Sequence, residues 1–508
     1  MNNPSSLNAA NPWTGLAVIS LALLPIGIDM TVLNVALPRL TIELGSTNAD
    51  KLWMVNAYSL VMAGLLPGFG ALSDRIGHRT LLLIGLALFG MASLGAAFAP
   101  TTGLFIVLRG TLAVGAAMIL PSTISIVRLI FTEDSQRATA IGIWGGVWSG
   151  CAALGPIVGG LLLNHFWWGS VFLINLPIVL LTMILTLAKI PHLPANKDRH
   201  WDLLTSLYLM VSLIGLLLAI KGALKADAVW SHVTLAFVLG CLFGFLFLRR
   251  QAHLPSPLVD FSLFRNTRFS AGACIAVLAT FALMGMQYIV SQELQLVRGF
   301  SPLTAGIYLL PVAIASFCSG LGAGKLMMGF GIERMMVATC ALGAFGTILY
   351  RFGGHMSQPW LELTTLALIG FAAGGAMAAA STAIMISAPN DKAGMAGAIE
   401  SVAYELGGTL GVAILGSVMG YIYSSTLSTA ALPVLPQAAR TSMEEAIGAA
   451  AHLPPDAGEA LITSAKTAYL SGVNASLALA ALVMAILLVM MTGLVIRNER
   501  KSPASGGR

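Results

Sequence analysis

Residues 394–411 read GMAGAIESVAYELGGTLG, an apolar and glycine-rich run that carries two carboxylates, Glu400 and Glu405. About 20 apolar residues are enough to cross a bilayer as one helix. A carboxylate in the hydrocarbon layer costs several kcal/mol, and such groups usually mark an ion or substrate pathway. We therefore interpret this stretch as a membrane-spanning helix that takes part in transport.

The composition of the whole chain is that of a polytopic membrane protein. Of its 508 residues 57% are hydrophobic and only 9% are charged, whereas soluble domains have about 25% charged residues. The net charge of +6 comes from basic residues spread over short segments, with no basic stripe. The composition therefore predicts the lipid bilayer, and not a nucleic acid, as the main partner.

Apolar runs bounded by polar residues, Pro or Gly predict fourteen membrane-spanning helices. They cover residues 14–37, 52–71, 80–99, 103–127, 138–161, 169–189, 203–221, 230–248, 269–291, 303–325, 334–353, 361–386, 394–422 and 470–496. Eighteen Lys and Arg residues fall on the side of the termini, eight fall on the opposite side, and Arg109 lies inside a span, which accounts for all 27. The positive-inside rule then predicts that both termini are cytoplasmic.

This order of spans predicts two six-helix halves that flank an inserted pair. The expected parts are a cytoplasmic N-terminus (1–13), an N-terminal half (14–189), two inserted helices (203–248), a C-terminal half (269–496) and a cytoplasmic tail (497–508). The long segment 423–469, which contains the Pro-rich stretch LPVLPQ, is expected to form a small extracytoplasmic cap.

A repeated sequence pattern supports the division into two related halves. GALSDRIGHR follows the second span and GKLMMGFGIER follows the tenth, and Gly70 and Gly77 match Gly324 and Gly331 at the same spacing. Two repeated halves around a midplane site are a transporter architecture.

Three further charged residues lie inside apolar runs. Asp29 follows Pro25 and Gly27 in the first span, and is either a pathway residue or a hydrogen-bonding group between helices. Glu293, near the outer end of the ninth span, is either interfacial or part of the pathway. Arg109 needs carbonyls or a carboxylate if it is buried. We favour an inward-facing Arg109 in a proton-coupling network over one that reaches for the membrane surface.

The spacing within residues 394–411 separates its two acids. Glu400 and Tyr404 are four residues apart and share a helix face, whereas Glu405 is five residues from Glu400 and about 140° around the helix. We expect one carboxylate in the central cavity and the other toward its edge or a neighbouring helix.

The turn after the second span holds a compact charged motif made of Gly70, Asp74, Arg75, Gly77 and Arg79. Gly77 suits a backbone position with positive φ. The motif is either a basic loop that fixes topology or a conformational latch.

The fifth span concentrates small residues and one proline, namely Gly146, Gly150, Gly155, Pro156, Gly159 and Gly160. Pairs of small residues four apart let helix backbones approach closely, and a proline inside a helix permits a bend. The span forms either ordinary tight packing or a pliable interface between the two halves.

Enzymatic and ATP-driven chemistry has little support. The eight histidines fall between spans or at span ends, and the five cysteines lie within spans. This arrangement suggests no metal site and no hydrolase. Gly324-Lys325 is not a nucleotide-binding loop, because Ser319 and Leu326 replace required residues. We expect no cofactor, no metal, no ATP and no catalytic residues.

Six stretches together resemble the major facilitator superfamily, and within it the fourteen-span drug:proton antiporters that export quaternary ammonium compounds. They are IDMTVLNVALP (28–38), GALSDRIGHR (70–79), LRGTLAVGAA (108–117), LGPIVGG (154–160), HFWWGSVFLINLPIVL (165–180) and AIESVAYELGGTLGVAILG (398–416). The resemblance implies an all-α major facilitator fold in a bacterial inner membrane, acting as a monomer. It also implies that Asp29, Glu400 and Glu405 carry substrate-cation and proton roles.

The expected function is proton-driven export of small lipophilic cations by alternating access. Aromatic side chains that could offer cation–π faces are Trp53, Tyr58, Trp144, Trp148, Tyr288 and Tyr404; the alternative for each is packing or an interfacial belt. One competing function is a transporter of a neutral or anionic metabolite, although only Arg109 offers an inward positive charge. Another is a membrane sensor or scaffold without transport, which would not need four intramembrane acids.

Overall fold

The computed structural model describes residues 11–46, 48–191, 202–223, 229–254, 257, 259–353, 359–389, 392–428, 438–440 and 442–501. Every regular element among these residues is helical, as the sequence predicted. Parts of the predicted N-terminus (1–10), of the long segment with LPVLPQ (429–437) and of the tail (502–508) lie outside the described residues.

The helices follow one another with short connections. The first are α1 (Pro12–Glu43), α2 (Asn48–Ile76), α3 (His78–Ala97), α4 (Thr102–Ile130), α5 (Asp134–His165), α6 (Ser170–Leu173), α7 (Asn175–Lys189), α8 (Leu203–Ala223) and α9 (Trp230–Gln251). Then come η2 (Phe261–Arg265), α10 (Thr267–Gln292), η3 (Glu293–Val297), α11 (Pro302–Tyr308), α12 (Leu310–Phe330), α13 (Ile332–Gly353), α14 (Pro359–Ser387), α15 (Ala393–Ser428), η5 (Ala438–Arg440), α16 (Met443–Ala450) and α17 (Pro455–Lys501).

Within the described residues, twelve helical stretches are long and apolar enough to cross a membrane. The predicted count of fourteen is therefore not confirmed, because α2 and α5 lie outside the twelve. These two helices are nevertheless long, with 29 and 32 residues. Helix α17 begins at Pro455, ahead of the last predicted span, 470–496. A helix satisfies its own backbone hydrogen bonds and can continue past the apolar run.

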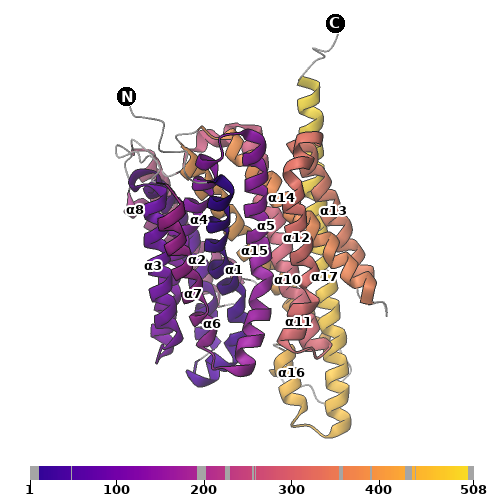
Figure 1. The fold of residues 1–508 in the computed structure, drawn as a ribbon. Coiled ribbons are helices and arrows are strands. Elements are labelled where there is room, and N and C mark those ends of the chain that lie inside the picture. The colour runs from indigo at the N-terminus through magenta and orange to yellow at the C-terminus, as the bar shows by residue number, and fades with distance from the viewer. Residues whose placement is uncertain are drawn as a thin grey trace, which may run out of the picture.

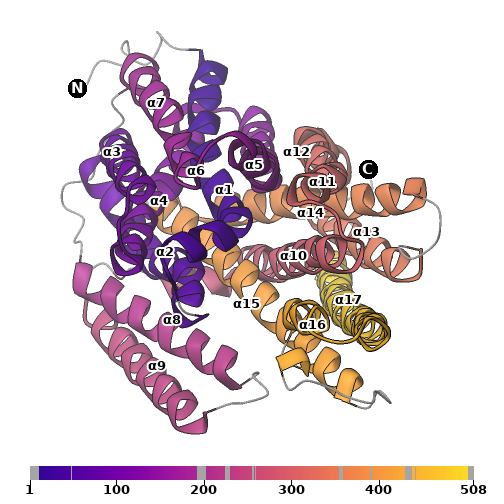
Figure 2. The ribbon, with the colours of Figure 1, turned by 90° about the horizontal axis from the view of Figure 1, so that it is seen from below.

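The helices form two groups with a pair at the side (Figures 1 and 2). We call α1–α7 the N-terminal group and α10–α17 the C-terminal group. The pair α8 and α9 lies outside the N-terminal group, where α8 packs against α2. Helix α15 packs against α10 on one side and against α2 and α4 on the other. The two acids of α15 are thereby carried on a helix that lies between the groups.

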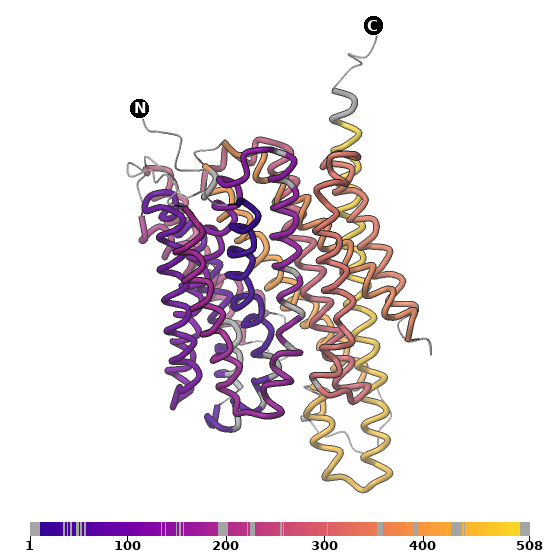
Figure 3. The backbone as a smooth tube through the Cα atoms, viewed as in Figure 1, coloured from indigo at the N-terminus to yellow at the C-terminus, as the bar shows by residue number. Residues whose placement is uncertain are grey.

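The two ends of the bundle differ. The beginning of α1 and the end of α17 lie at the same end, and α16 with the first turns of α17 projects at the opposite end (Figures 1 and 3). Met443, Ala446 and Leu461 of this projection are buried, and they belong to the same hydrophobic cluster as residues of α10 and α15. The Tyr423 hydroxyl fastens it to α15 by donating to the carbonyl of Ala439 at 2.8 Å.

The repeated sequence pattern after the second and tenth predicted spans has a structural counterpart. Gly77 separates α2 from α3 with φ +95°, and Gly331 separates α12 from α13 with φ +83°. The left-handed backbone that the sequence predicted at Gly77 is therefore present, and it recurs at its predicted match. A side chain at either position would strain this backbone.

Charged side chains connect segments at the end of the bundle where α1 begins. Lys392, just before α15, donates to Asp260 at 2.5 Å. This hydrogen bond, with smaller help from Ser262, lowers the pKa of Asp260 to about 2. Arg128 of α4 donates to the carbonyl of Ala388 at 2.7 Å, which connects the two helix groups.

Helices α5 and α12 meet through glycines. A Cβ atom on Gly320 would lie 2.7 Å from the carbonyl oxygen of Gly142 and 2.9 Å from Cα of Gly146. Gly146, singled out in the sequence, thus lies where the two groups touch. The backbones approach so closely that no side chain fits between them.

We expect Gly320→Ala to destabilise the protein by about 1–3 kcal/mol, the usual cost of overpacking a tight contact. Gly322→Ala on the same helix is the matched control, because a Cβ there would meet nothing within 4 Å. The measurement is the melting temperature of each purified variant in detergent. Equal melting temperatures for the two variants would show that α5 and α12 can move apart at this contact without loss of stability.

Candidate functional site

Asp29 of α1 and Arg109 of α4 form a buried ion pair. Nη1 of Arg109 donates to Oδ2 of Asp29 at 2.5 Å, and its Nε donates to the carbonyl of Met54 at 3.4 Å. The two side chains are 0% and 2% exposed, respectively. Arg109 therefore faces inward between helices, and the Asp29 charge is neutralised by a group of the protein itself.

Tyr58 of α2 connects this pair to α15. The Arg109 guanidinium lies 4.7 Å from the centroid of the Tyr58 ring, in a cation–π contact. Tyr58 is buried, and Asp29, Arg109 and Glu405 all lie within electrostatic range of it. Asp29, Arg109, Tyr58 and Glu405 therefore form one neighbourhood built from α1, α2, α4 and α15.

Glu400 lies in a different environment on the same helix. The Tyr404 hydroxyl donates to Oε1 of Glu400 at 2.9 Å and also lies 3.2 Å from the carbonyl oxygen of Met377 on α14. Ser381 of α14 is a further polar neighbour. The two acids of α15 thus face different helices: Glu400 lies beside α14 of the C-terminal group and Glu405 near α2 of the N-terminal group.

Within the part of the chain that the structure describes, neither acid of α15 has a positive partner. Glu400 is 1% and Glu405 is 4% exposed. Among the residues that the structure describes, no ion pair involves either carboxylate. A buried charge without a partner is strongly unfavourable. A bound proton or a bound cation would neutralise such a carboxylate.

Glu293 is not near these groups but belongs to a third set of charges. Arg298 donates to Glu293 at 3.1 Å and to Glu362, the fourth residue of α14, at 2.8 Å. Both carboxylates are buried. Glu362 is a buried acid that sequence reasoning missed. It is the second residue of the predicted span 361–386, where a charged side chain is expected to reach the polar membrane surface. Its only signal was that LTTLALIG continues the apolar run directly after it.

The six candidate aromatics lie in different surroundings. Tyr58 and Tyr404 contact Arg109 and Glu400, as described above. Trp144 is buried and donates to the Thr123 hydroxyl at 3.2 Å, which makes it part of the N-terminal packing. Trp148 is also buried, Tyr288 is partly buried, and Trp53 is 41% exposed.

The charged motif after α2 is held by neighbouring helices. Asp74 lies 3.8 Å from His78, whose Nδ1 is 2.6 Å from the Ser73 hydroxyl. Arg79 donates to the carbonyl of Leu187 on α7 at 2.8 Å, while Arg75 is exposed. Gly70, at the start of the motif, is buried within α2.

The glycines of α5 set its distance from α1. A Cβ on Gly155 would overlap the hydroxyl of Thr31, two residues after Asp29. Gly159 is buried, and a Cβ on Gly160 would lie 3.0 Å from Cβ of Leu303. Pro156 lies within α5, but its side chain is outside the described residues. Gly155 therefore lets α5 pack directly against the segment of α1 that carries Asp29.

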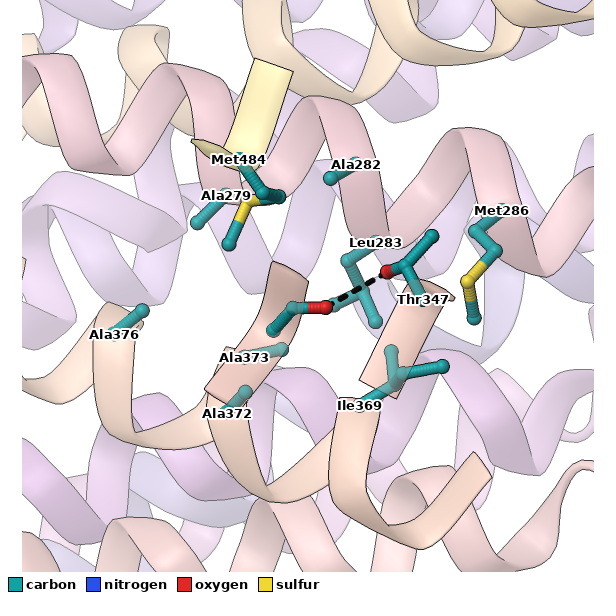
Figure 4. Close-up of a pocket in the computed structure, with 11 residues that line it drawn as sticks. Ala279, Ala282, Leu283, Met286, Thr347, Ile369, Ala372, Ala373, Ala376 and Met484 are labelled. Atoms are coloured by element: carbon teal, nitrogen blue, oxygen red, sulfur yellow. Dashed lines mark hydrogen bonds between the residues drawn. The ribbon is translucent and has the colours of Figure 1, made fainter. Parts of the chain in front are cut away.

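A small apolar cavity lies elsewhere in the C-terminal group (Figure 4). It is lined by apolar residues of α10, α13, α14 and α17, including Met286, Ile369 and Met484. The only hydroxyl at its wall, that of Thr347, already donates to the carbonyl of Gly343 at 2.8 Å. None of its eleven lining residues is charged, so it offers nothing that would neutralise a cation.

Comparisons with known proteins agree with this architecture. The sequence profile of the Major Facilitator Superfamily matches residues 19–412. The methyl viologen resistance protein SmvA of Salmonella typhimurium is 39% identical over 491 residues, which cover 96% of this chain and 99% of that protein. The multidrug efflux pump LfrA of Mycolicibacterium smegmatis is 36% identical over 472 residues, covering 92% and 94%. The human organic anion transporter MFSD10 (TETRAN) has a similar fold, with a TM-score of 0.60, 13% identity, and coverage of 94% of this chain and 100% of that one.

Proposed function

The chain belongs to the Major Facilitator Superfamily, as its motifs predicted, and we propose that it exports lipophilic organic cations in exchange for protons. The proposed substrates are quaternary ammonium biocides, methyl viologen and cationic dyes, moved across a bacterial inner membrane by alternating access. Two relatives bear names of this kind, a methyl viologen resistance protein and a multidrug efflux pump. Such relatives favour a transporter over an enzyme.

The observation that carries the proposal is the burial of Glu400 and Glu405 without an ion pair in the described structure. A proton and an organic cation can each neutralise such a carboxylate, so the two compete for it. Competition for one charge is a negative coupling between the two ligands, and this coupling is reciprocal. Proton binding from outside then expels the cation, and cation binding from inside expels the proton.

Asp29 has a conditional role in this proposal. In the present conformation Arg109 neutralises it, so it offers no charge to a cation. Arg109 also donates to the Met54 carbonyl and lies over the Tyr58 ring. These two groups would stabilise its positive charge in place of Asp29. We propose that a shift of Arg109 toward these groups exposes Asp29 to a proton or substrate in another state of the cycle. Because Asp29 engages Arg109, that arginine offers no ready site for an anionic metabolite.

The membrane arrangement is completed by α2 and α5 in this proposal. These two helices are about 44 and 48 Å long, which exceeds the roughly 30 Å thickness of the hydrocarbon core. Counting them as spans would raise the number from twelve to fourteen. The N-terminal half would then be 14–189, the inserted pair 203–248 and the C-terminal half 269–496. Both termini would be cytoplasmic, the projection of α16 and α17 extracytoplasmic, and the protein a monomer.

Efflux of a fluorescent cation from energised cells tests the proposed function. Cells that express the protein should extrude the dye faster than cells without it, and a protonophore should abolish the difference. Dye extrusion that persists after the proton gradient has collapsed would overturn proton coupling. Equal extrusion with and without the protein, at verified expression, would overturn export itself.

A further inference from the structure

A second buried charged cluster lies at the end of the C-terminal group from which α16 projects (Figure 1). We call Glu293, Arg298, Tyr308, Tyr350 and Glu362 the outer cluster. Glu293 lies in η3, and Arg298 directly follows this element. Tyr308, Tyr350 and Glu362 lie in α11, α13 and α14, respectively. Four separate segments therefore contribute to one polar cluster.

Within the outer cluster, Glu362 accepts hydrogen bonds from four donor atoms. Arg298 donates to both of its oxygens, at 2.9 and 2.8 Å. The hydroxyls of Tyr308 and Tyr350 donate to it at 2.6 and 3.2 Å. A bidentate guanidinium with further donors is the strongest arrangement for an ionised carboxylate. Glu362 and Arg298 therefore form a neutral pair that holds the guanidinium in a fixed place.

Glu293 accepts a longer hydrogen bond from this guanidinium than Glu362 does. Nη2 of Arg298 donates to Oε1 of Glu293 at 3.1 Å, but the same nitrogen donates to Glu362 at 2.8 Å. Tyr350, and Tyr469 on α17, lie within electrostatic range of Glu293, and Glu444 of α16 acts on Tyr469. With both carboxylates ionised, the outer cluster would carry a formal charge of −1. A proton on one carboxylate removes this excess charge.

We propose that the outer cluster is a second proton-binding site, in which Glu293 takes up a proton from the extracytoplasmic solvent. Glu362 is a positioning residue that keeps Arg298 neutralised. Solvent reaches the cluster at Arg298, whose side chain is 26% exposed, while Glu293 itself is 1% exposed. The inference rests on the proposed function, because proton entry from this side is what the exchange requires.

The outer cluster is separate from the acids of α15. Met377, which lies beside Tyr404, follows Glu362 by 15 residues on α14, a distance of about 22 Å along the helix axis. A cation bound at Glu400 therefore cannot touch Glu293. Loss of Glu293 should leave cation binding intact and impair only the proton-driven step.

The first test compares Glu293→Gln with wild type, using tetraphenylphosphonium as the probe. We expect binding in detergent to stay within about twofold, while transport into proteoliposomes driven by a pH gradient falls roughly a hundredfold, the lower range for loss of a positioned proton-transfer group. Glu459→Gln, the same change at an exposed position of α17, is the matched control and should transport like wild type.

The second test records infrared spectra of the purified proteins as the pH is lowered. Glu293→Gln should lack one band of a protonated carboxylic acid that wild type and Glu459→Gln show. Glu362→Gln should lack it as well, because Glu293 then becomes the sole counter-ion of Arg298 and stays ionised. This measurement needs a folded protein but no transport.

The outcomes separate the two proposals. A wild-type protein that does not exchange the probe for protons overturns the proposed function. A wild-type protein that does so, with Glu293→Gln transporting at the same rate or keeping every acid band, overturns the outer cluster as a proton site alone.

Discussion

Glu400→Gln is expected to abolish proton-coupled efflux of quaternary ammonium compounds while the protein still inserts into the membrane. Gln has nearly the shape of Glu and can accept the hydrogen bond that Tyr404 donates to Glu400 at 2.9 Å. The change also removes a buried charge that has no basic partner in the described structure, so it should not destabilise the fold. What it removes is the group that a proton or a cation must neutralise.

The measurement is resistance to a quaternary ammonium biocide, with dye efflux in parallel, at matched expression. Glu405→Gln provides an internal comparison, because Glu405 lies near Tyr58 of α2 and Glu400 beside α14. We expect the two variants to differ in how cation binding depends on pH. Near-normal efflux in Glu400→Gln would remove this residue from the proposed mechanism.

The sequence predicted the features that depend on neighbours along the chain. Apolar runs located the helices because the hydrocarbon layer demands about 20 such residues in a row. The turn at Gly77 followed from the conformational freedom of glycine, and its match at Gly331 from the repeat. The opposed placement of Glu400 and Glu405 followed from helix geometry alone.

Features that join distant segments could not be predicted in this way. The contact between Asp29 and Arg109 joins residues 80 positions apart, and no periodicity of α1 or α4 specifies it. Glu362 lies at the polar end of the predicted span 361–386, and only its partner Arg298 and two tyrosines reveal that it is buried. The same holds for the first turns of α17, which are polar in sequence but pack against α16.

Asp29→Asn is expected to abolish efflux and also to destabilise the protein, unlike Glu400→Gln. The substitution leaves Arg109 in a site where its side chain is 2% exposed and without its carboxylate. An uncompensated buried charge of this kind costs about 3–5 kcal/mol. The measurement is the melting temperature of the purified protein together with efflux at matched expression.

The double variant Asp29→Asn/Arg109→Gln separates the two consequences. Removing both charges eliminates the uncompensated guanidinium, so stability should return toward that of wild type. Efflux should stay lost, because neither the exchangeable carboxylate nor its counter-ion is present. A single variant that melts like wild type would show that the Met54 carbonyl and the Tyr58 ring suffice for Arg109, and that Asp29 is already free to change partners. A double variant that still exports cations would assign the pair to packing and leave Glu400 and Glu405 as the carriers of the exchange.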